Sequence, residues 1–253
     1  MDAIDRVHVV PLGNEFDRIV EPVTRLRADI VYLLEDPDPH VDERTYHDEI
    51  EAALADAGVD IRTRSCDLAD VYDVLGAVTT IAAEHEGDSV RVNVSGAGTL
   101  AAVGATIACM DVATDATPYY VEPEEYAHDA TETPISRGMA GLSELPSYPV
   151  DSPSPDQISL MAFLLEQEGT TKRPKKRDLI EHAEAEELSF ITERAPANDK
   201  AKFRLLDSVI TPLEEDGYVE VRSVGRRRVV ELTEQGRNAV RAFRHKIDAT
   251  PES

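Results

Sequence analysis

The sequence predicts an α/β domain with a parallel sheet over residues 1–146, followed by a smaller helical domain with a β-hairpin over residues 156–253. Two patterns predict this organisation. Short apolar runs alternate with helical stretches through the first domain, as in a parallel sheet whose two faces are covered by helices. A stretch rich in proline and serine then predicts a stiff polar linker at residues 147–155.

Five apolar runs of strand length are expected to form the sheet: Val7–Leu12, Ile30–Leu34, Val59–Arg64, Val90–Val94 and Pro118–Val121. Four segments between them are expected to be helices: Glu15–Arg27, Thr45–Ala57, Asp70–His85 and Thr99–Met110. We expect Pro22 to interrupt the first helix, because proline lacks the N–H that a helix interior needs. The alternation predicts a Rossmann-like, doubly wound domain. Beyond it, the acidic stretch Glu122–Asp129 predicts a loop and Ile135–Met139 one more strand.

The second domain has the element order of a winged helix-turn-helix. Three helices are expected first: Asp156–Glu168, Lys175–Ala185 and a third that runs from an Asn198 cap to Asp216. Two strands and a last helix follow: Tyr218–Ser223, Val229–Leu232 and the segment that Thr233 caps. In the third helix, a single buried stripe is expected from the spacing of Phe203, Leu206, Ile210 and Leu213.

The charge is unevenly distributed along the chain. There are 50 acids against 26 bases, a net charge of −24. Residues 1–150 hold 30 acids and nine Arg but no Lys, whereas residues 151–253 hold 20 acids and 17 bases. An acidic chain argues against a nucleic-acid partner. However, the acid-rich, lysine-poor first domain resembles proteins of extreme halophiles, in which acids serve solvation in brine. The places where bases remain are therefore informative about partners.

Three clusters of bases fall where a winged helix contacts DNA. They lead into the second helix, occupy the start of the third and form the hairpin tip: Lys175, Lys176 and Arg177; Lys200, Lys202 and Arg204; Arg226, Arg227 and Arg228. Adjacent guanidinium groups suit phosphate oxygens or a minor groove, and a phosphate would offset positive charge at a helix start. We therefore expect the second domain to bind double-stranded DNA. The alternatives are a solvated basic face and a winged helix that binds another protein.

A family resemblance supports this expectation. The segments Leu213–Val219, Gly225–Arg228 and Leu232–Gly236 resemble regulators of the MarR and ArsR kind, in which the recognition helix ends in a Gly-Tyr/Leu-Val turn before the wing. The resemblance covers roughly residues 155–247. It implies a DNA-binding transcriptional regulator.

A ligand site is expected in the first domain, beyond the carboxyl ends of the first and fourth strands, where the strand order of a doubly wound sheet reverses. Two loops supply the candidate residues: Gly13, Asn14, Asn93, Ser95, Gly96, Ala97, Gly98 and Thr99. Free N–H groups at the helix start and two hydroxyls make an anion cradle. A dinucleotide is not expected, because the Gly-x-Gly-x-x-Ala spacing follows the fourth strand and no acid ends the next strand. The structural alternative is that these glycines only let the helix pack closely on the strand.

Asn93, Ser95 and the neighbouring glycines, with Gly13 after the first strand, resemble the CARF domain, the Rossmann-like sensor of CRISPR-associated regulators. With a winged helix joined to the CARF domain, the resemblance covers the whole chain. It implies a homodimer formed through the sensor domain, with a cyclic oligoadenylate bound across the two-fold axis. Thr99 stands where the family motif has a basic residue. A small neutral or nucleotide-like effector therefore stays open as an alternative.

Catalysis, cofactors and membranes are not expected. Some CARF domains cleave their ring ligand, so a ring nuclease is the rival class, but no histidine lies near these loops in the sequence. Cys66 and Cys109 are too few for a disulfide framework or a zinc site, so we expect neither a metal nor a cofactor. No apolar run reaches the roughly 20 residues of a membrane span, and no signal peptide is recognisable. We expect a cytoplasmic protein.

Overall fold

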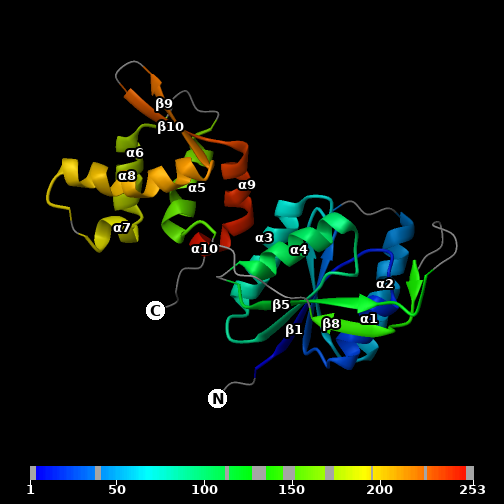
Figure 1. Ribbon diagram of the computed structural model, residues 1–253. Helices are drawn as coiled ribbons and strands as arrows, with labels where there is room; N and C mark the ends of the chain where they lie inside the picture. The colour runs from blue at the N-terminus through cyan, green and yellow to red at the C-terminus, as the bar shows by residue number, and fades with distance from the viewer. Residues whose placement is uncertain are drawn as a thin grey trace. The chain divides into compact units, whose positions relative to one another are not determined.

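The computed structural model describes residues 4–37, 41–111, 114–126, 135–144, 152–168, 174–194, 196–224 and 227–248, without the side chains of 41–46, 223, 224 and 227. The chain divides into two compact units, Met1–Ser152 and Pro153–Ser253 (Figure 1). The first unit is an α/β domain and the second is helical with a β-hairpin. Most of the expected linker lies outside the described residues, and its last two, Ser154 and Pro155, cap and begin a helix.

A six-stranded sheet forms the centre of the first unit, in the order β3-β2-β1-β4-β5-β8. Its strands are β1 (Arg6–Pro11), β2 (Ile30–Glu35), β3 (Asp60–Ser65), β4 (Ser89–Asn93), β5 (Ala116–Glu122) and β8 (Gly141–Glu144). The first five pair in parallel, and the order reverses between β1 and β4. The Rossmann-like prediction is thus confirmed. The short β8 pairs antiparallel with β5 and was not predicted from the sequence.

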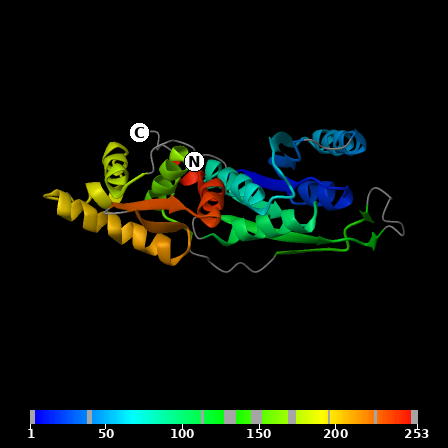
Figure 2. The same cartoon turned by 90° about the horizontal axis from the view of Figure 1, so that it is seen from above.

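Two pairs of helices cover the sheet: α1 (Asp17–Arg25) with α2 (Val41–Asp56), and α3 (Val71–Glu84) with α4 (Thr99–Met110). Ile19 and Ile50 from the first pair pack in a fully buried cluster on Val10 and Leu33 of the sheet. The second pair lies side by side over the sheet in both views (Figures 1 and 2). The sequence predicted all four helices.

Two expectations for the first unit are wrong. α1 runs without interruption through Pro22. The stretch after β5 is not simply a loop, because Glu125–Tyr126 (β6) pairs antiparallel with Ser136–Arg137 (β7). Within the segment Ile135–Met139, only these two β7 residues are in a strand, and they belong to this small ribbon instead of the main sheet.

A buried polar pair lies within the main sheet. His8 Nδ1 is 3.0 Å from the hydroxyl of Tyr119, and both side chains are fully buried. Burial, together with the nearby charges of Arg91 and Arg6, lowers the pKa of His8 to about 4. The neutral imidazole is therefore the form that the folded domain accommodates.

The second unit has the winged helix arrangement that the sequence predicted. Its elements are α5 (Pro155–Gln167), α6 (Lys176–Ala185), α7 (Ser189–Thr192), α8 (Asp199–Glu215), β9 (Val219–Val224), β10 (Arg227–Leu232), α9 (Glu234–Phe243) and α10 (His245–Asp248). A single antiparallel bridge joins Lys175 to Val229, so the segment before α6 adds a rudimentary third strand to the hairpin. The short α7 was not predicted.

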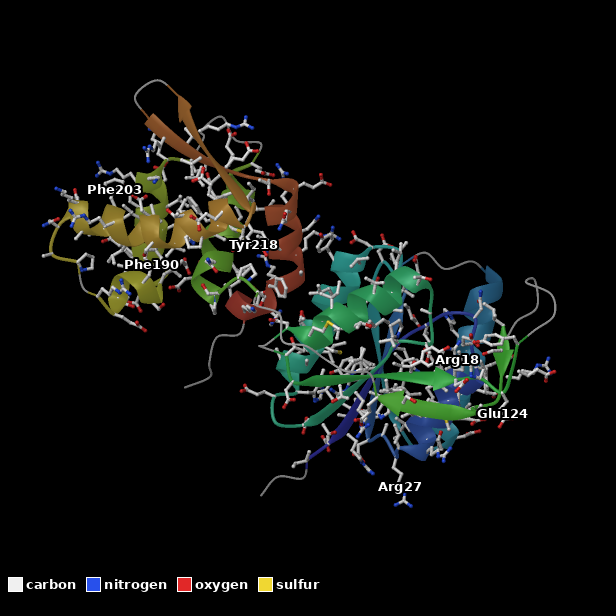
Figure 3. The ribbon with its side chains drawn as sticks, in the orientation of Figure 1. Arg18, Arg27, Glu124, Phe190, Phe203 and Tyr218 are labelled. Carbon is white, nitrogen blue, oxygen red and sulfur yellow. The ribbon has the colours of Figure 1, made fainter. Side chains whose placement is uncertain are left out.

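The core of this unit collects apolar residues from the helices and from both strands of the hairpin. Leu206, Ile210 and Leu213 of α8 are at most 1% exposed and pack against it. Phe203 is 37% exposed, so the prediction that it belongs to the buried stripe is wrong. Its exposed position on α8 can be followed in Figure 3.

Candidate functional site

The exposed face of α8 is polar and carries bases. Asn198 caps the helix, and its side chain accepts a hydrogen bond of 3.0 Å from the N–H of Ala201. Outside the buried stripe, four exposed residues follow one another along the helix: Lys200, Arg204, Ser208 and Thr211. Cations and hydroxyls along one helix face are groups that read base edges in a major groove. Ser208 and Thr211 were missed in the sequence, because hydroxyl residues on a helix face give no pattern of their own.

Two of the predicted bases on α8 are available for a partner. Lys200 and Arg204 are exposed and, within the described part of the chain, form no ion pair. They are four residues apart and therefore lie on neighbouring turns of the same face. A partner with phosphates or base edges would meet their charges without first breaking a contact.

Other predicted bases pair with acids inside the second unit. Lys202 forms an ion pair with Glu184, which raises the pKa of Lys202, and Lys176 forms one with Asp207. Both pairs connect α6 to α8. Arg177 lies 3.1 Å from Glu181 one turn along α6, and both side chains are exposed. The pairs of Lys176 and Lys202 therefore hold the two helices against each other.

The N-terminus of α6 also differs from the expectation. Its positive residues do not stand alone, because the side chain of Asp178 accepts a 2.8 Å hydrogen bond from the N–H of Lys175. An acid in the first turn offsets the unfavourable interaction of Lys175 and Lys176 with the helix dipole. A bound phosphate is therefore not required there, although the exposed Lys175 could still contact one.

The hairpin is longer than predicted, which changes the place of its arginines. β9 and β10 pair in register from Val219–Leu232 to Val224–Arg227. Arg227 and Arg228 consequently lie in β10 and not in the tip, and Arg228 is exposed. Arg226 and Gly225 lie outside the described residues. On β9, Arg222 forms ion pairs with Glu220 and, at 3.6 Å, with Glu231.

In the first unit, the loops after β1 and β4 meet beyond the sheet, as predicted. They pack backbone against backbone: a Cβ on Gly13 would lie 2.5 Å from the carbonyl oxygen of Gly96, and one on Gly96 would lie 2.7 Å from that of Pro11. No side chain fits at either position. Because the two backbones come so close, both glycines have a structural role that does not depend on a ligand.

Asn93 and Ser95 are buried and hydrogen-bonded within the protein. The amide of Asn93 donates to the carbonyl of Arg18 at 2.8 Å. Its Oδ1 accepts from the N–H and the hydroxyl of Ser95 at 2.8 and 2.6 Å. Pro22 explains the first bond, because a proline four residues after Arg18 provides no N–H for that carbonyl. Asn93 supplies the missing donor and joins β4 to α1.

Arg18 is a buried cation at the same edge of the sheet. It pairs with Glu15 at 2.8 Å and donates from Nε to the carbonyl of Val121 at 2.9 Å. The second carboxylate oxygen of Glu15 accepts from the hydroxyl of Ser136. Figure 3 labels Arg18 close to the end of β5. Glu15 and Ser136 are 121 residues apart in the chain, so no local sequence pattern predicts this cluster.

The solvent-facing part of the predicted site is small and uncharged. Gly98 and Thr99 are exposed at the start of α4, and Asn14 and Ala97 are half-buried beside them. Gly98 caps α4 without a side-chain hydrogen bond. Along α4, three apolar side chains are also exposed: Leu100 at 50%, Val103 at 43% and Ile107 at 39%. The chemistry of this edge is that of backbone N–H groups and apolar contact.

No group of three or more His, Cys, Asp or Glu side chains in the described part of the chain could hold a metal ion. Among the same residues, no helix is both long enough and apolar enough to cross a bilayer.

Two parts of the chain match known domain families. Residues 6–126 match an N-terminal domain family described as HFX_2341_N-like. Residues 156–244 match the DUF6293 C-terminal winged helix domain. The second unit is thus a winged helix domain by sequence as well as by its element order. A search of curated proteins finds no match.

Two solved structures show a distant likeness to the chain. Csm6 from Enterococcus italicus, bound to cyclic hexa-2'-fluoro-hexa-dAMP, is 8% identical with a TM-score of 0.40, over 85% of this chain and 56% of that one. Can2 from Sulfobacillus thermosulfidooxidans, in complex with cyclic tetra-adenylate, is 10% identical with a TM-score of 0.41, over 95% of this chain and 64% of that one. This chain spans less than two thirds of the length of either structure.

Proposed function

We propose that this chain is a DNA-binding transcriptional regulator whose first unit senses a small effector. The observation that carries the proposal is the exposed face of α8, where Lys200 and Arg204 stand without ion partners among the described residues, in line with Ser208 and Thr211. In winged helix proteins, the helix before the hairpin enters the major groove. Here that helix is α8.

DNA contact would divide among three parts of the second unit: α8, the start of α6 and the wing. Lys200 and Arg204 would read base edges, while Lys175, Arg177 and the arginines of the wing, Arg226 to Arg228, would contact phosphates. In strong brine the Debye length falls to about 3 Å, so long-range attraction contributes little. Direct contacts must then provide most of the affinity, and we expect Arg226→Ala with Arg227→Ala to abolish binding.

The effector would bind beyond β1 and β4, between the loops that contain Asn14 and Ala97–Thr99. Asn93, Ser95 and Gly96 are buried, so they would hold the loop in shape without touching the ligand. Backbone N–H groups at the start of α4 suit an anionic or hydrogen-bonding group. A cyclic oligoadenylate, or another nucleotide-like molecule with few phosphate contacts, is the ligand class that we propose.

We further propose a homodimer formed through the first unit. α4 contains no charged residue, although 30% of the residues in the chain are charged. Its exposed Leu100, Val103 and Ile107 form one apolar stripe on this uncharged helix. A second copy of the same face can cover the stripe without bringing two acidic surfaces together. The two winged helices would then reach half-sites about 34 Å apart, one turn of DNA.

α4 offers a physical connection between effector and winged helix. Its N-terminus begins at the effector loop, and at its C-terminus Asp111 accepts a hydrogen bond from the hydroxyl of Ser152. Ser152 is the last residue of the first unit, and the second begins at Pro153. A small movement of α4 on effector binding would therefore act on the chain segment that leads into the second unit.

Chromatin immunoprecipitation with sequencing, on tagged protein in its own cells, tests the proposal. We expect discrete peaks upstream of genes, which disappear in a chain with Lys200→Ala and Arg204→Ala. The matched control loses two exposed bases of the first unit, Arg25→Ala and Arg137→Ala, and keeps the peaks. Enrichment no greater than in untagged cells would overturn the proposal.

A further inference from the structure

Two exposed tyrosines lie together at the carboxyl end of β5. Tyr120 is 36% exposed and Tyr126, on β6, is 57% exposed. The interaction with the side chain of Tyr120 raises the pKa of Tyr126. The chain has only eight Tyr and five Phe and no Trp, so two adjacent exposed rings are a concentration of scarce aromatic surface.

The side chain of Arg18 holds the ring of Tyr120 in place. The guanidinium carbon of Arg18 lies 5.1 Å from the centre of this ring. Arg18 itself is 7% exposed and is fixed by Glu15 and by the carbonyl of Val121. A cation behind one face of an aromatic ring fixes its plane and leaves the opposite face for a second planar group.

The two rings also adjoin the proposed effector loop. The N–H of Val121, next to Tyr120, donates to the hydroxyl of Ser95 at 3.1 Å. Ser95 directly precedes the loop that continues through Ala97 to Thr99. A molecule seated on the start of α4 therefore has an aromatic surface within its reach, at the edge where doubly wound folds bind ligands.

The charged residues around Tyr120 determine which part of a nucleotide fits beside the ring. The residues that follow Tyr120 include the exposed acids Glu122, Glu124 and Glu125, and the charge of Arg18 is already balanced by Glu15. A phosphate would meet net negative charge at this place. A planar base with an exocyclic amino group would instead find ring faces for stacking and carboxylates to accept its N–H groups.

We infer that Tyr120 and Tyr126 form a stacking platform for an amino-purine base of the effector, with the phosphates directed toward the loop at the start of α4. The inference rests on the proposed effector function and names the part of the ligand that the first unit recognises. Removal of an aromatic side chain on which one base stacks weakens binding by about tenfold or more.

Titration calorimetry on the full chain tests it, with cyclic tetra-adenylate as the probe and cyclic tetra-uridylate for comparison. Tyr126→Leu removes a ring, Tyr126→Phe keeps it, and Tyr72→Leu removes an exposed tyrosine of α3 elsewhere in the unit. We expect Tyr126→Leu to weaken binding of the adenylate at least tenfold and the other two variants less than twofold. We also expect the uridylate, which lacks an amino group, to bind the wild-type chain more weakly.

Two outcomes would overturn different parts of the account. Tight adenylate binding that Tyr126→Leu leaves unchanged would overturn the platform while the effector proposal stands. Failure of the wild-type chain to bind cyclic tetra-adenylate, the dinucleotide ApA or AMP at millimolar concentration would overturn both.

Discussion

Asn93 and Pro22 meet at one backbone carbonyl, that of Arg18. A sequence motif assigned Asn93 to the ligand, whereas in the fold its amide replaces the N–H that Pro22 lacks, 71 residues earlier in the chain. The pairing also explains why α1 continues through a proline. Neither residue predicts the other from sequence alone, because the contact depends on how α1 packs beside β4.

Asn93→Ala should destabilise the first unit by about 2–3 kcal/mol, because it leaves buried polar groups of Arg18 and Ser95 without partners. Pro22→Ala restores an N–H that can donate a hydrogen bond to the carbonyl of Arg18. In the double variant, the loss in the free energy of unfolding should therefore be smaller than the sum of the losses in the two single variants, by about 0.5 kcal/mol or more. Urea unfolding of the four proteins measures this coupling, and strictly additive free energies would contradict the account.

His8 should make stability depend on pH between its two pKa values. The unfolded chain has the ordinary His pKa of about 6.5, whereas the folded chain holds it at about 4. Since the unfolded state binds the extra proton in this window, the stabilisation is complete above pH 6.5 and is lost as pH falls. From pH 7 to 5.5 the free energy of unfolding should fall by about 1 kcal/mol more in the wild type than in His8→Val. Equal falls in both proteins would contradict this assignment.

At the scale of elements, α6 and α8 carry acids that form ion pairs with two of the bases predicted to contact DNA. The ion pair between Lys202 and Glu184 restrains a lysine on α8, the helix proposed to contact DNA, and adds negative charge near it. A motif of bases in sequence cannot reveal these partners, because Glu184 lies 18 residues away on another helix. In the proposed complex, this pair would lower the affinity for DNA.

Glu184→Gln should strengthen DNA binding by about fivefold, because it frees Lys202 and removes one charge that repels phosphate. Glu193→Gln, an exposed acid at the end of α7, makes the same change in net charge at another place and serves as the control. Fluorescence anisotropy on a bound promoter fragment measures both. An equal gain in the two variants would mean that only the total charge matters and would contradict a specific role for the pair.

α4 is the element on which the proposed dimer depends. Val103→Glu places a charge at the centre of its apolar stripe and should shift the protein from dimer to monomer, since a buried unpaired carboxylate is costly. Thr80→Glu on α3 is a control at a half-buried position outside the stripe. Light scattering after gel filtration reports the mass of each. A wild-type monomer, or a Val103→Glu dimer of unchanged affinity, would contradict the proposed interface.

For the whole molecule, the sequence predicted what depends on local pattern. The five parallel strands, their reversal between β1 and β4, and the helices α3, α4, α5, α6 and α8 all follow from apolar spacing and caps. The short strand β8 was missed because Gly141–Glu144 has only four residues and no alternation. The buried contacts of Arg18 with Val121 and of Glu15 with Ser136 were missed because they join distant segments.

The molecule joins an acidic α/β unit to a winged helix with a few available bases, and the central claim is that these bases bind DNA. Anisotropy titration of the full chain on a fragment recovered from its own promoters, at the salt concentration of the cell, tests this most directly. Lys200→Ala with Arg204→Ala should weaken binding by about tenfold or more, while Arg25→Ala with Arg137→Ala changes it little. Equal affinities of the two double variants and the wild type would contradict the account.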